Sequence, residues 1–442
     1  MKRNLACAFF IALSLKGSAQ DAPVTRLNLS QCIEIALENN LNVRRSALQT
    51  ESARISWQQA RANLLPSVNA GITHGINQGR SIDPLTNTYV NNEIVYASPY
   101  LNGSLLLFNG MKFQNLIKQN ALIYQAVKEE KRQEEDNITL NVVITYLQVL
   151  TNQDLLELEK RKQEITLKQV ERLEILNKNG AIAPGNYFDL KGQYAADRIS
   201  VINAGNVLES SKISLAEQLN IPYTKDLQLE NLSAEQLSPL LDSSAQQVYQ
   251  SALQNYAAIK ATDLRKKNAD IQLKTIRSGY LPSIYLNTGI SSNFSNVARD
   301  IEGRTIGYFE QFNNNQSKGF SVGMSFPVFN SFRTKNAGSL ARLNLRENEV
   351  LAQTIRIQLQ HIIEQAYFNM TASKERDIAL QEQKEAFAES FRIAEVRFAE
   401  GVINSVDYLA AKNNLDIANS NLVTNRYDLI LRKKILEIYQ GK

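Results

Sequence analysis

Two runs of about 70 residues, free of proline and almost free of glycine, constrain the fold of this chain most. The first covers 109–179 and is interrupted only by Gly110, and the second covers 330–400 and contains Gly338. Because proline and glycine are the residues that most disfavour an α-helix, each run predicts one continuous helix. At 1.5 Å per residue such a helix is about 105 Å long, which exceeds any compact domain of this size. We therefore expect a mainly α, extended architecture.

Each long run ends at a glycine, which a short turn and a second helical segment follow. Gly180 and Gly401 suit the left-handed position that ends a helix. Pro184 then suits the first position of the next helix, and Ser405 suits an N-cap. These features predict one long helical hairpin that the chain makes twice.

Apolar and small residues recur at steps of three and four after each turn, the pattern of a coiled-coil seam. In the second hairpin the seam positions are Tyr408, Ala411, Leu415, Ala418 and Leu422. In the first hairpin they are Tyr187, Leu190, Tyr194, Val201, Ala204 and Leu208. Asp197 interrupts the first seam at the position where the second seam has Ala418. A single polar residue of this kind lowers stability without abolishing the pattern.

The two hairpins belong to a repeat that covers the whole exported chain. Residues 35–68 align with 251–284 without gaps, at an offset of 251 − 35 = 216. Farther along the chain the offset becomes 401 − 180 = 221, as between the two hairpin glycines. We expect two tandem structural repeats, 20–230 and 231–442, each in the order helix, two strands, long helix and shorter helix.

Within each repeat, two segments change from a helical period to a period of two. The expected strands are about 66–78, 95–108, 282–294 and 318–329. Strands of about ten residues with one apolar and one polar face are typical of a membrane barrel, although a half-buried soluble hairpin alternates in the same way. Closing a barrel takes at least about eight strands, and an open edge is not tolerated in lipid. A barrel would therefore require several copies of this chain.

The N-terminus predicts export. Residues 1–19 have the form of a secretory signal peptide, with Lys2 and Arg3 before an apolar run and small residues before the cleavage site. Removing its three basic residues lowers the formal charge from +5 to 5 − 3 = +2, which is too small to indicate nucleic acid binding. Cys32 is then the only cysteine, so no internal disulfide forms. No exported segment approaches the 18 or so apolar residues of a membrane helix, so any membrane span must consist of strands.

The residues that catalysis or metal binding requires are not grouped in this sequence. The two histidines, His74 and His361, are not spaced as metal ligands. Neither a phosphate-binding glycine loop nor a nucleophile elbow occurs. We therefore predict no catalytic, cofactor-binding or metal-binding residues and no enzymatic activity.

Four features in this order make the chain resemble the TolC-like outer-membrane efflux proteins, also called outer membrane factors. They are the tandem repeat, Leu-Pro-Ser before each first strand, Phe-Asn-Gly or Phe-Asn-Ser after each second strand, and Arg397-Phe398-x-x-Gly401 followed by Val406-Asp407-Tyr408-Leu409. The resemblance implies a homotrimer whose twelve strands form one barrel in outer-membrane lipid, continued by a helical coiled-coil tunnel in the periplasm. It also implies a passive efflux or type I secretion duct that works with a periplasmic adaptor and an inner-membrane pump in a Gram-negative bacterium.

The same resemblance implies acidic residues that narrow the periplasmic aperture near the turn. Asp407 matches the first acidic position of the family, whereas Ala410 stands at the second, so this chain departs from the pattern. The equivalent positions in the first hairpin are Asn186 and Asp189. Three copies of Asp189 and Asp407 would form a ring that favours cations. Alternatively, Asp407 only complements the dipole of its helix.

Docking of the adaptor is expected at the hairpin tips. The residues expected there are Gly180, Ala181, Ile182, Gly401, Val402, Ile403 and Asn404. Two other functions stay open at this point: a periplasmic coiled-coil adaptor and a structural envelope protein. An adaptor would have one long hairpin flanked by compact β domains, rather than two hairpins and four two-faced strands.

Overall fold

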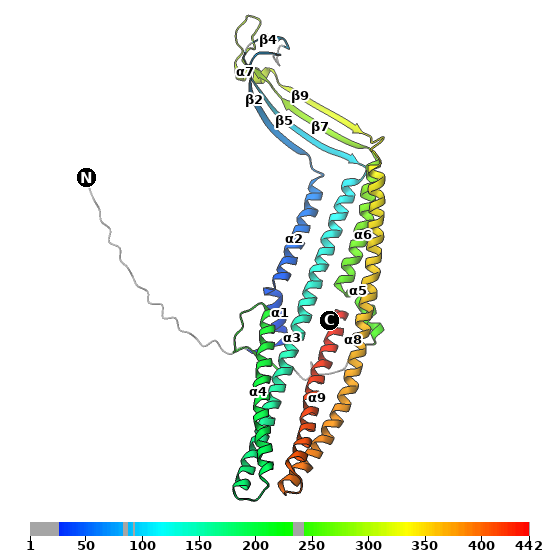
Figure 1. The fold of residues 1–442 in the computed structure, drawn as a ribbon. Coiled ribbons are helices and arrows are strands. Elements are labelled where there is room, and N and C mark those ends of the chain that lie inside the picture. The colour runs from blue at the N-terminus through cyan, green and yellow to red at the C-terminus, as the bar shows by residue number, and fades with distance from the viewer. Residues whose placement is uncertain (1–25, 83–86, 92, 233–242, 442) are drawn as a thin grey trace, which may run out of the picture. The chain divides into compact units, whose positions relative to one another are not determined.

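A computed structural model describes residues 26–82, 87–91, 93–232 and 243–441. The predicted signal peptide, 1–19, lies outside these described residues. The fold is mainly helical, as the sequence predicts (Figure 1). Among the described residues, no helix combines the length and the apolarity that a membrane crossing requires.

The helices include two pairs of equal length. Both α3 and α8 have 67 residues, and both α4 and α9 have 36. The helices are α1 (Leu29–Asn39), α2 (Leu41–Ala62), α3 (Lys112–Lys178), α4 (Pro184–Leu219), α5 (Ala245–Asn255), α6 (Ala257–Arg277), the 3-10 helix η1 (Ser278–Tyr280), α7 (Tyr308–Asn314), α8 (Arg333–Ala399) and α9 (Ser405–Gln440).

The first helix predicted for the first repeat is two helices, α1 and α2, that meet at Asn40. The side-chain oxygen of Asn40 accepts hydrogen bonds from the backbone N–H groups of Asn42 at 2.8 Å and Val43 at 3.3 Å, and so caps α2. Asparagine is among the best N-cap residues, so it starts a new helix here. A similar break occurs between α5 and α6 at Tyr256, which is 256 − 40 = 216 residues later.

The chain divides into two compact units. The hairpin unit takes Met1–Ala36, Val142–Ser238 and Gln383–Tyr427, and the sheet unit takes Leu37–Asn141, Pro239–Glu382 and Asp428–Lys442. In the hairpin unit, α4 lies along α3 and α9 lies along α8 (Figure 1). In the sheet unit, a core of helical residues contains Val248, Ala252, Ile259, Leu359, Ile363, Ala366, Met370, Leu429 and Leu436.

A short pair of strands and the residue after it are fixed to α3. Strand β1 (Arg26–Leu27) pairs in parallel with β6 (Gln228–Leu229). The buried Tyr146 of α3 donates its hydroxyl proton to the carbonyl oxygen of Glu230 at 2.6 Å. A tyrosine hydroxyl that is buried needs such a partner, so this bond fixes Glu230 against the helix.

Four long strands form the main sheet. They are antiparallel in the order β2 (Ser67–Asn77), β5 (Ile94–Asn109), β7 (Ser283–Ser291) and β9 (Ser317–Ser325) (Figure 1). Three short strands lie in the connections at one end: β3 (Arg80–Ile82), β4 (Tyr89–Asn91) and β8 (Phe294–Ser295). Within the described strands, β2 and β9 each leave one edge without a partner.

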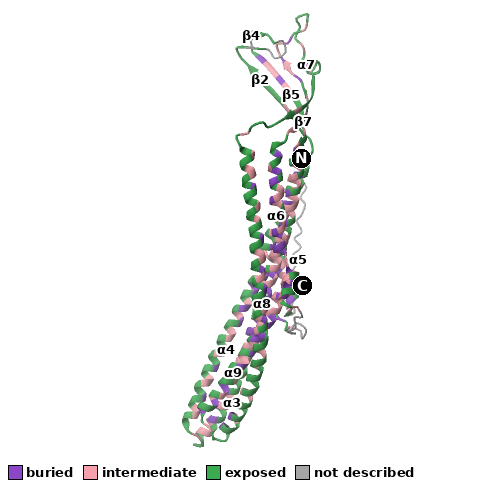
Figure 2. Ribbon diagram, turned by 90° about the vertical axis from the view of Figure 1, so that its right-hand side faces the viewer, coloured by how far each residue is buried: buried purple, intermediate pink, exposed green. Residues whose placement is uncertain are grey.

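The register sorts the sheet into an apolar face and a polar face. Cross-strand partners such as Leu286 and Val322 share the apolar face, where Phe320 is 74% exposed and Val322 60%. The polar face consists mainly of asparagine, serine, threonine, glycine and tyrosine, together with Ile94 and Leu106. None of its positions in these four strands is Asp, Glu, Lys or Arg, and the one charged residue of the strands, Lys318, is the partner of Ile290 on the apolar face. Most residues of β2, β7 and β9 are exposed, whereas most of β5 is half-buried or buried (Figure 2). An exposed apolar face of this extent indicates a surface that contacts another apolar phase.

Tyrosine rings cover glycines on the polar face. Gly71 is the cross-strand partner of Tyr100, and Gly323 is the partner of Tyr285. A Cβ added at Gly71 would lie 2.6 Å from the hydroxyl oxygen of Tyr100, and one added at Gly323 would clash with the ring of Tyr285. These positions therefore require glycine because another side chain approaches the backbone closely.

Candidate functional site

The ends of the two hairpins are built by the predicted glycines. Gly180 has φ = +68° and Gly401 has φ = +74°, so both adopt the left-handed conformation. The amide after each glycine, Ala181 or Val402, donates to the carbonyl oxygen five residues earlier, at 2.9 Å and 2.8 Å. This bond closes the last helical turn and satisfies a carbonyl that would otherwise lack a partner.

Gly401→Ala is expected to lower the free energy of unfolding by about 1 to 2 kcal/mol, because alanine is strained in the left-handed conformation. Gly192 of α4 is the matched control, since a Cβ there meets open space and the residue is helical. Gly192→Ala should raise stability by up to about 1 kcal/mol. Urea unfolding of the purified protein, followed by circular dichroism, measures both changes. If Gly401→Ala were as stable as the wild type or more stable, the left-handed turn at Gly401 would not require glycine.

The two helices after the turns start differently. Pro184 is the first residue of α4, as predicted. The prediction that Ser405 is an N-cap is wrong, because α9 already begins at Ser405. Asn404 caps this helix instead, and its side-chain oxygen accepts from the backbone N–H of Asp407 at 2.9 Å. Asn and Ser are about equally good caps, so the sequence could not separate them.

Ser405 joins the two hairpins. Its hydroxyl donates to a carboxylate oxygen of Asp189 at 2.6 Å, and its backbone N–H donates to the side-chain oxygen of Asn186 at 3.2 Å. Ser405 is 2% exposed, whereas Asp189 and Asp407 are exposed. Two predicted aperture residues, Asn186 and Asp189, thus form hydrogen bonds with Ser405. The sequence predicted only a capping role for this serine.

The predicted tip residues divide into exposed and packed groups. Gly180, Ala181, Gly401, Val402 and Asn404 are exposed, and Val402 is 59% exposed. Ile182 and Ile403 are half-buried and pack against the apolar core beneath the turns. The two isoleucines therefore hold the turns on the helices, while the others present an accessible surface.

The core beneath the turns has residues from all four hairpin helices. It consists of Val170, Leu173, Leu190, Phe398 and Tyr408. Tyr408 is fully buried and stacks on Phe398, with ring centroids 4.7 Å apart. Burial raises the pKa of the Tyr408 hydroxyl, which has no hydrogen-bond partner among the described residues. Tyr408 thus stabilises the hairpin ends through its ring rather than its hydroxyl.

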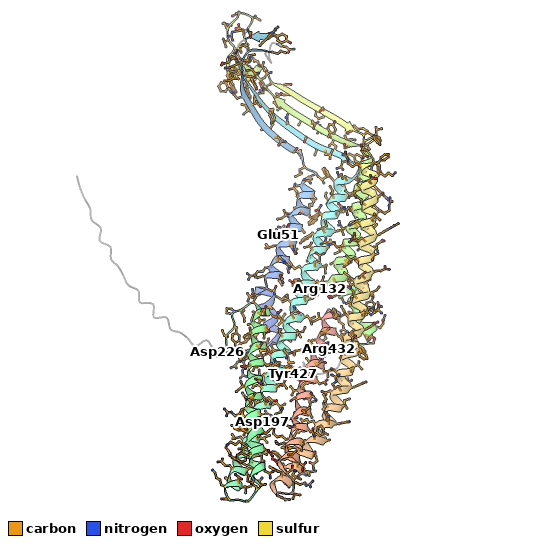
Figure 3. All side chains as sticks on the ribbon, viewed as in Figure 1. Glu51, Arg132, Asp197, Asp226, Tyr427 and Arg432 are labelled. Atoms are coloured by element: carbon orange, nitrogen blue, oxygen red, sulfur yellow. The ribbon has the colours of Figure 1, made fainter. Side chains whose placement is uncertain are left out.

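Asp197, the residue that interrupts the first seam, belongs to a buried polar cluster (Figure 3). One carboxylate oxygen accepts from the Thr166 hydroxyl at 2.5 Å, and the other accepts from the Gln193 amide at 2.7 Å. The ammonium of Lys412, from the second hairpin, lies 3.6 Å from Asp197 and 2.9 Å from Asp416. The sequence singled out Asp197 but missed Lys412, whose burial depends on residues from the other hairpin.

Metal-binding groups are not assembled in the part of the chain that the structure describes. There, no set of three or more His, Cys, Asp or Glu side chains is arranged to hold a metal ion. His74 lies in β2 and His361 in α8.

Comparison of the sequence with known proteins gives one family match and several relatives. The profile of the family described as Outer membrane efflux protein matches residues 32–220 and 248–437. The chain is 23% identical over 433 residues to the outer membrane protein TolC of Escherichia coli (strain K12), covering 96% of this chain and 83% of TolC. It is 24% identical over 432 residues to the probable outer membrane lipoprotein SilC of Salmonella typhimurium, covering 93% of this chain and 84% of SilC.

Solved structures share the fold. The outer membrane protein VceC of Vibrio cholerae superposes with a TM-score of 0.80 at 16% identity, covering 93% of this chain and 96% of VceC. The CmeC outer membrane channel of Campylobacter jejuni gives a TM-score of 0.77 at 16% identity, covering 100% of this chain and 94% of CmeC. The resemblance predicted from the sequence motifs is therefore confirmed at the level of sequence profile and fold.

Proposed function

Because the chain belongs to the outer membrane efflux protein family, we propose that it is a passive exit duct in the outer membrane of a Gram-negative bacterium. In this role it gives a tripartite efflux or type I secretion system its path out of the periplasm. The relatives TolC and SilC are both outer membrane proteins by name. The prediction that the chain is not an enzyme agrees with this family.

The two-faced sheet with unpaired edges is the observation that carries the proposal. Its apolar face suits outer-membrane lipid, and its uncharged polar face suits a water-filled lumen. The free edges of β2 and β9 cannot stay open in lipid, since each unpaired backbone group there costs several kcal/mol. Three copies would pair these edges and give a twelve-stranded barrel. Each chain would contribute two tandem repeats, and the hairpins of these repeats would form the coiled-coil tunnel.

The exposed hairpin tips are the proposed docking surface for a periplasmic adaptor. Val402 and Val406 are 59% and 66% exposed, and Phe188 is 60% exposed, so each hairpin presents apolar groups near its end. Exposed apolar side chains at a helix end favour packing against another helical partner. The adaptor would in turn connect the duct to an inner-membrane pump, which supplies the energy.

Charge at the hairpin ends is expected to set ion selectivity. Asp189 and Asp407 are exposed there, beside Asn186, and three copies would bring six carboxylates to the periplasmic aperture. Replacing both with Asn should lower the cation-to-anion permeability ratio about fivefold, since a unit charge 4 Å away contributes about 1 kcal/mol in water. The measurement is the reversal potential across a planar bilayer in a salt gradient.

Asp226→Asn is the control for this experiment, because Asp226 is exposed in the same unit but away from the hairpin ends (Figure 3). It should leave the reversal potential unchanged. Unaltered selectivity in the double variant would return Asp407 to the alternative role, in which it only complements the dipole of α9.

Fractionation separates the duct from the two other functions, a periplasmic adaptor and an envelope spacer. We expect the native protein in the outer-membrane fraction and, after detergent extraction, a trimer in native mass spectrometry. Recovery as a soluble periplasmic protein would contradict the duct and favour the adaptor. The sheet already disfavours the adaptor, because its apolar face has no covering layer among the described residues.

A further inference from the structure

The polar cluster around Lys412 differs from the other contacts between the hairpins. Lys412 is 2% exposed, and lysine is almost never this deeply buried without paired charges. Its ammonium lies 2.9 Å from Asp416 on its own helix and 3.6 Å from Asp197 on the first hairpin. Thr166 and Gln193 complete the hydrogen bonds of Asp197.

The charges in this cluster do not balance. Two carboxylates face one ammonium, so full ionisation leaves a net negative charge in a buried site. Lys162 also acts on Asp416 and lowers its pKa, but its ammonium lies 2.8 Å from Glu159, so this pair leaves the net charge of the site negative. The neighbouring Tyr408 hydroxyl adds no charge, because burial, and then the carboxylate of Glu395 on α8, raise its pKa. Because an uncompensated buried charge is costly, the cluster favours taking up one proton.

The repeat shows that a hairpin does not need this cluster. The position equivalent to Lys412 in the first hairpin is Lys191, since 412 − 221 = 191. Lys191 is exposed, with its ammonium 5.6 Å from the centre of the Tyr187 ring. The equivalent of Asp197 in the second hairpin is Ala418, which is buried and apolar. At these two equivalent positions the described structure therefore has no buried ion pair, in contrast to the contact between the hairpins.

We propose that Asp197, Lys412 and Asp416 form a proton-binding site that sets how tightly the first hairpin holds the second. The proposal rests on the proposed duct, whose periplasmic end can widen only if the hairpins shift relative to each other. At acidic pH the two hairpins stay together and the periplasmic end is narrow. At neutral pH the contact between the hairpins weakens, and the end can widen. The site binds one proton, which the carboxylate of Asp416 accepts.

The direction of the effect follows from the two partners of Lys412. Burial raises the pKa of Asp416, while the ammonium groups of Lys412 and Lys162 lower it and the carboxylate of Asp197 raises it further. When the hairpins separate, Asp416 is hydrated and its pKa returns toward the ordinary value. The joined state therefore binds the proton more tightly and gains population as the pH falls. Protonated Asp416 no longer attracts Lys412, whose ammonium then pairs with Asp197 alone.

The test compares channel conductance between about pH 8 and pH 4 in planar bilayers. Wild-type conductance should fall in acid, by about tenfold in the open-to-closed ratio for each unit of pKa difference between the two states. Asp416→Asn imitates the protonated form and should conduct poorly at every pH. Lys412→Met should move the acid response to higher pH, because Asp416 and Asp197 then face each other without the ammonium that lowers the pKa of Asp416. The control Lys191→Met should leave the response unchanged.

A second readout makes the test independent of the duct. Spin labels at Ala181→Cys and Val402→Cys, in a Cys32→Ala background, report the distance between the two hairpin tips in purified protein. The distance should shorten in acid for the wild type and stay short for Asp416→Asn. If the wild type forms no channel, the duct fails, and the spin-label distances still decide this site. An acid response that survives Asp416→Asn, or a tip distance that ignores pH in the wild type, would overturn it.

Discussion

Val322→Arg is expected to prevent assembly of the protein in the outer membrane. Val322 lies on the apolar face of the sheet, opposite Leu286, and is 60% exposed. On a face that contacts lipid, an arginine near the middle of the bilayer costs about 2 to 4 kcal/mol. A trimer would bear this cost three times. The measurement is the amount of folded trimer recovered from outer membranes, or the urea midpoint of folding into liposomes.

Ser321→Arg is the matched control, because Ser321 is the neighbouring residue on the polar face and pairs with Asn287. Its side chain would enter a water-filled lumen, so assembly should be close to that of the wild type. The two variants add the same charge at adjacent positions and differ only in the face that receives it. Equal losses of assembly would show that the apolar face does not contact lipid.

Tyr408→Ala is expected to destabilise the hairpin ends by about 3 to 5 kcal/mol, the usual cost of removing a buried aromatic side chain. The ring is fully buried and contacts Phe398 and Phe391, with centroids 4.7 Å and 5.6 Å away. Tyr408→Phe should have stability near that of the wild type, because the lost hydroxyl has no partner among the described residues. Urea unfolding of the purified protein measures both variants.

Val406→Ala provides the surface control for Tyr408, since Val406 is 66% exposed and lies two residues earlier in α9. It should change stability by less than about 0.5 kcal/mol. A large loss in Tyr408→Phe would instead reveal a hydrogen bond of the hydroxyl and contradict the assignment of stability to the ring.

Local chemistry explains which parts of the fold the sequence could predict. The long helices follow from runs without proline and almost without glycine, and the turns follow from Gly180 and Gly401, because glycine tolerates a positive φ at little cost. The mainly α fold class and the family resemblance were accessible for the same reason. The break at Asn40 is also a local feature, because an asparagine can cap a new helix inside a helical composition, but the predicted single helix does not include it.

Contacts between distant segments explain what the sequence could not predict. Ser405 resembles a cap until Asp189, 216 residues earlier, is placed beside its hydroxyl. Lys412 resembles any surface lysine until Asp197 lies 3.6 Å away. In the sheet, a period of two indicates which residues share a face, but only the register pairs Gly71 with Tyr100.

Single-channel recording of the purified trimer in a planar bilayer tests the passive duct most directly. A passive duct should give discrete, ohmic conductance steps without any energy source, and the current should persist when no adaptor or pump is present. If the correctly assembled trimer gave no conductance at any pH and voltage tested, the passive duct would be contradicted. A structural role in the envelope would then be favoured.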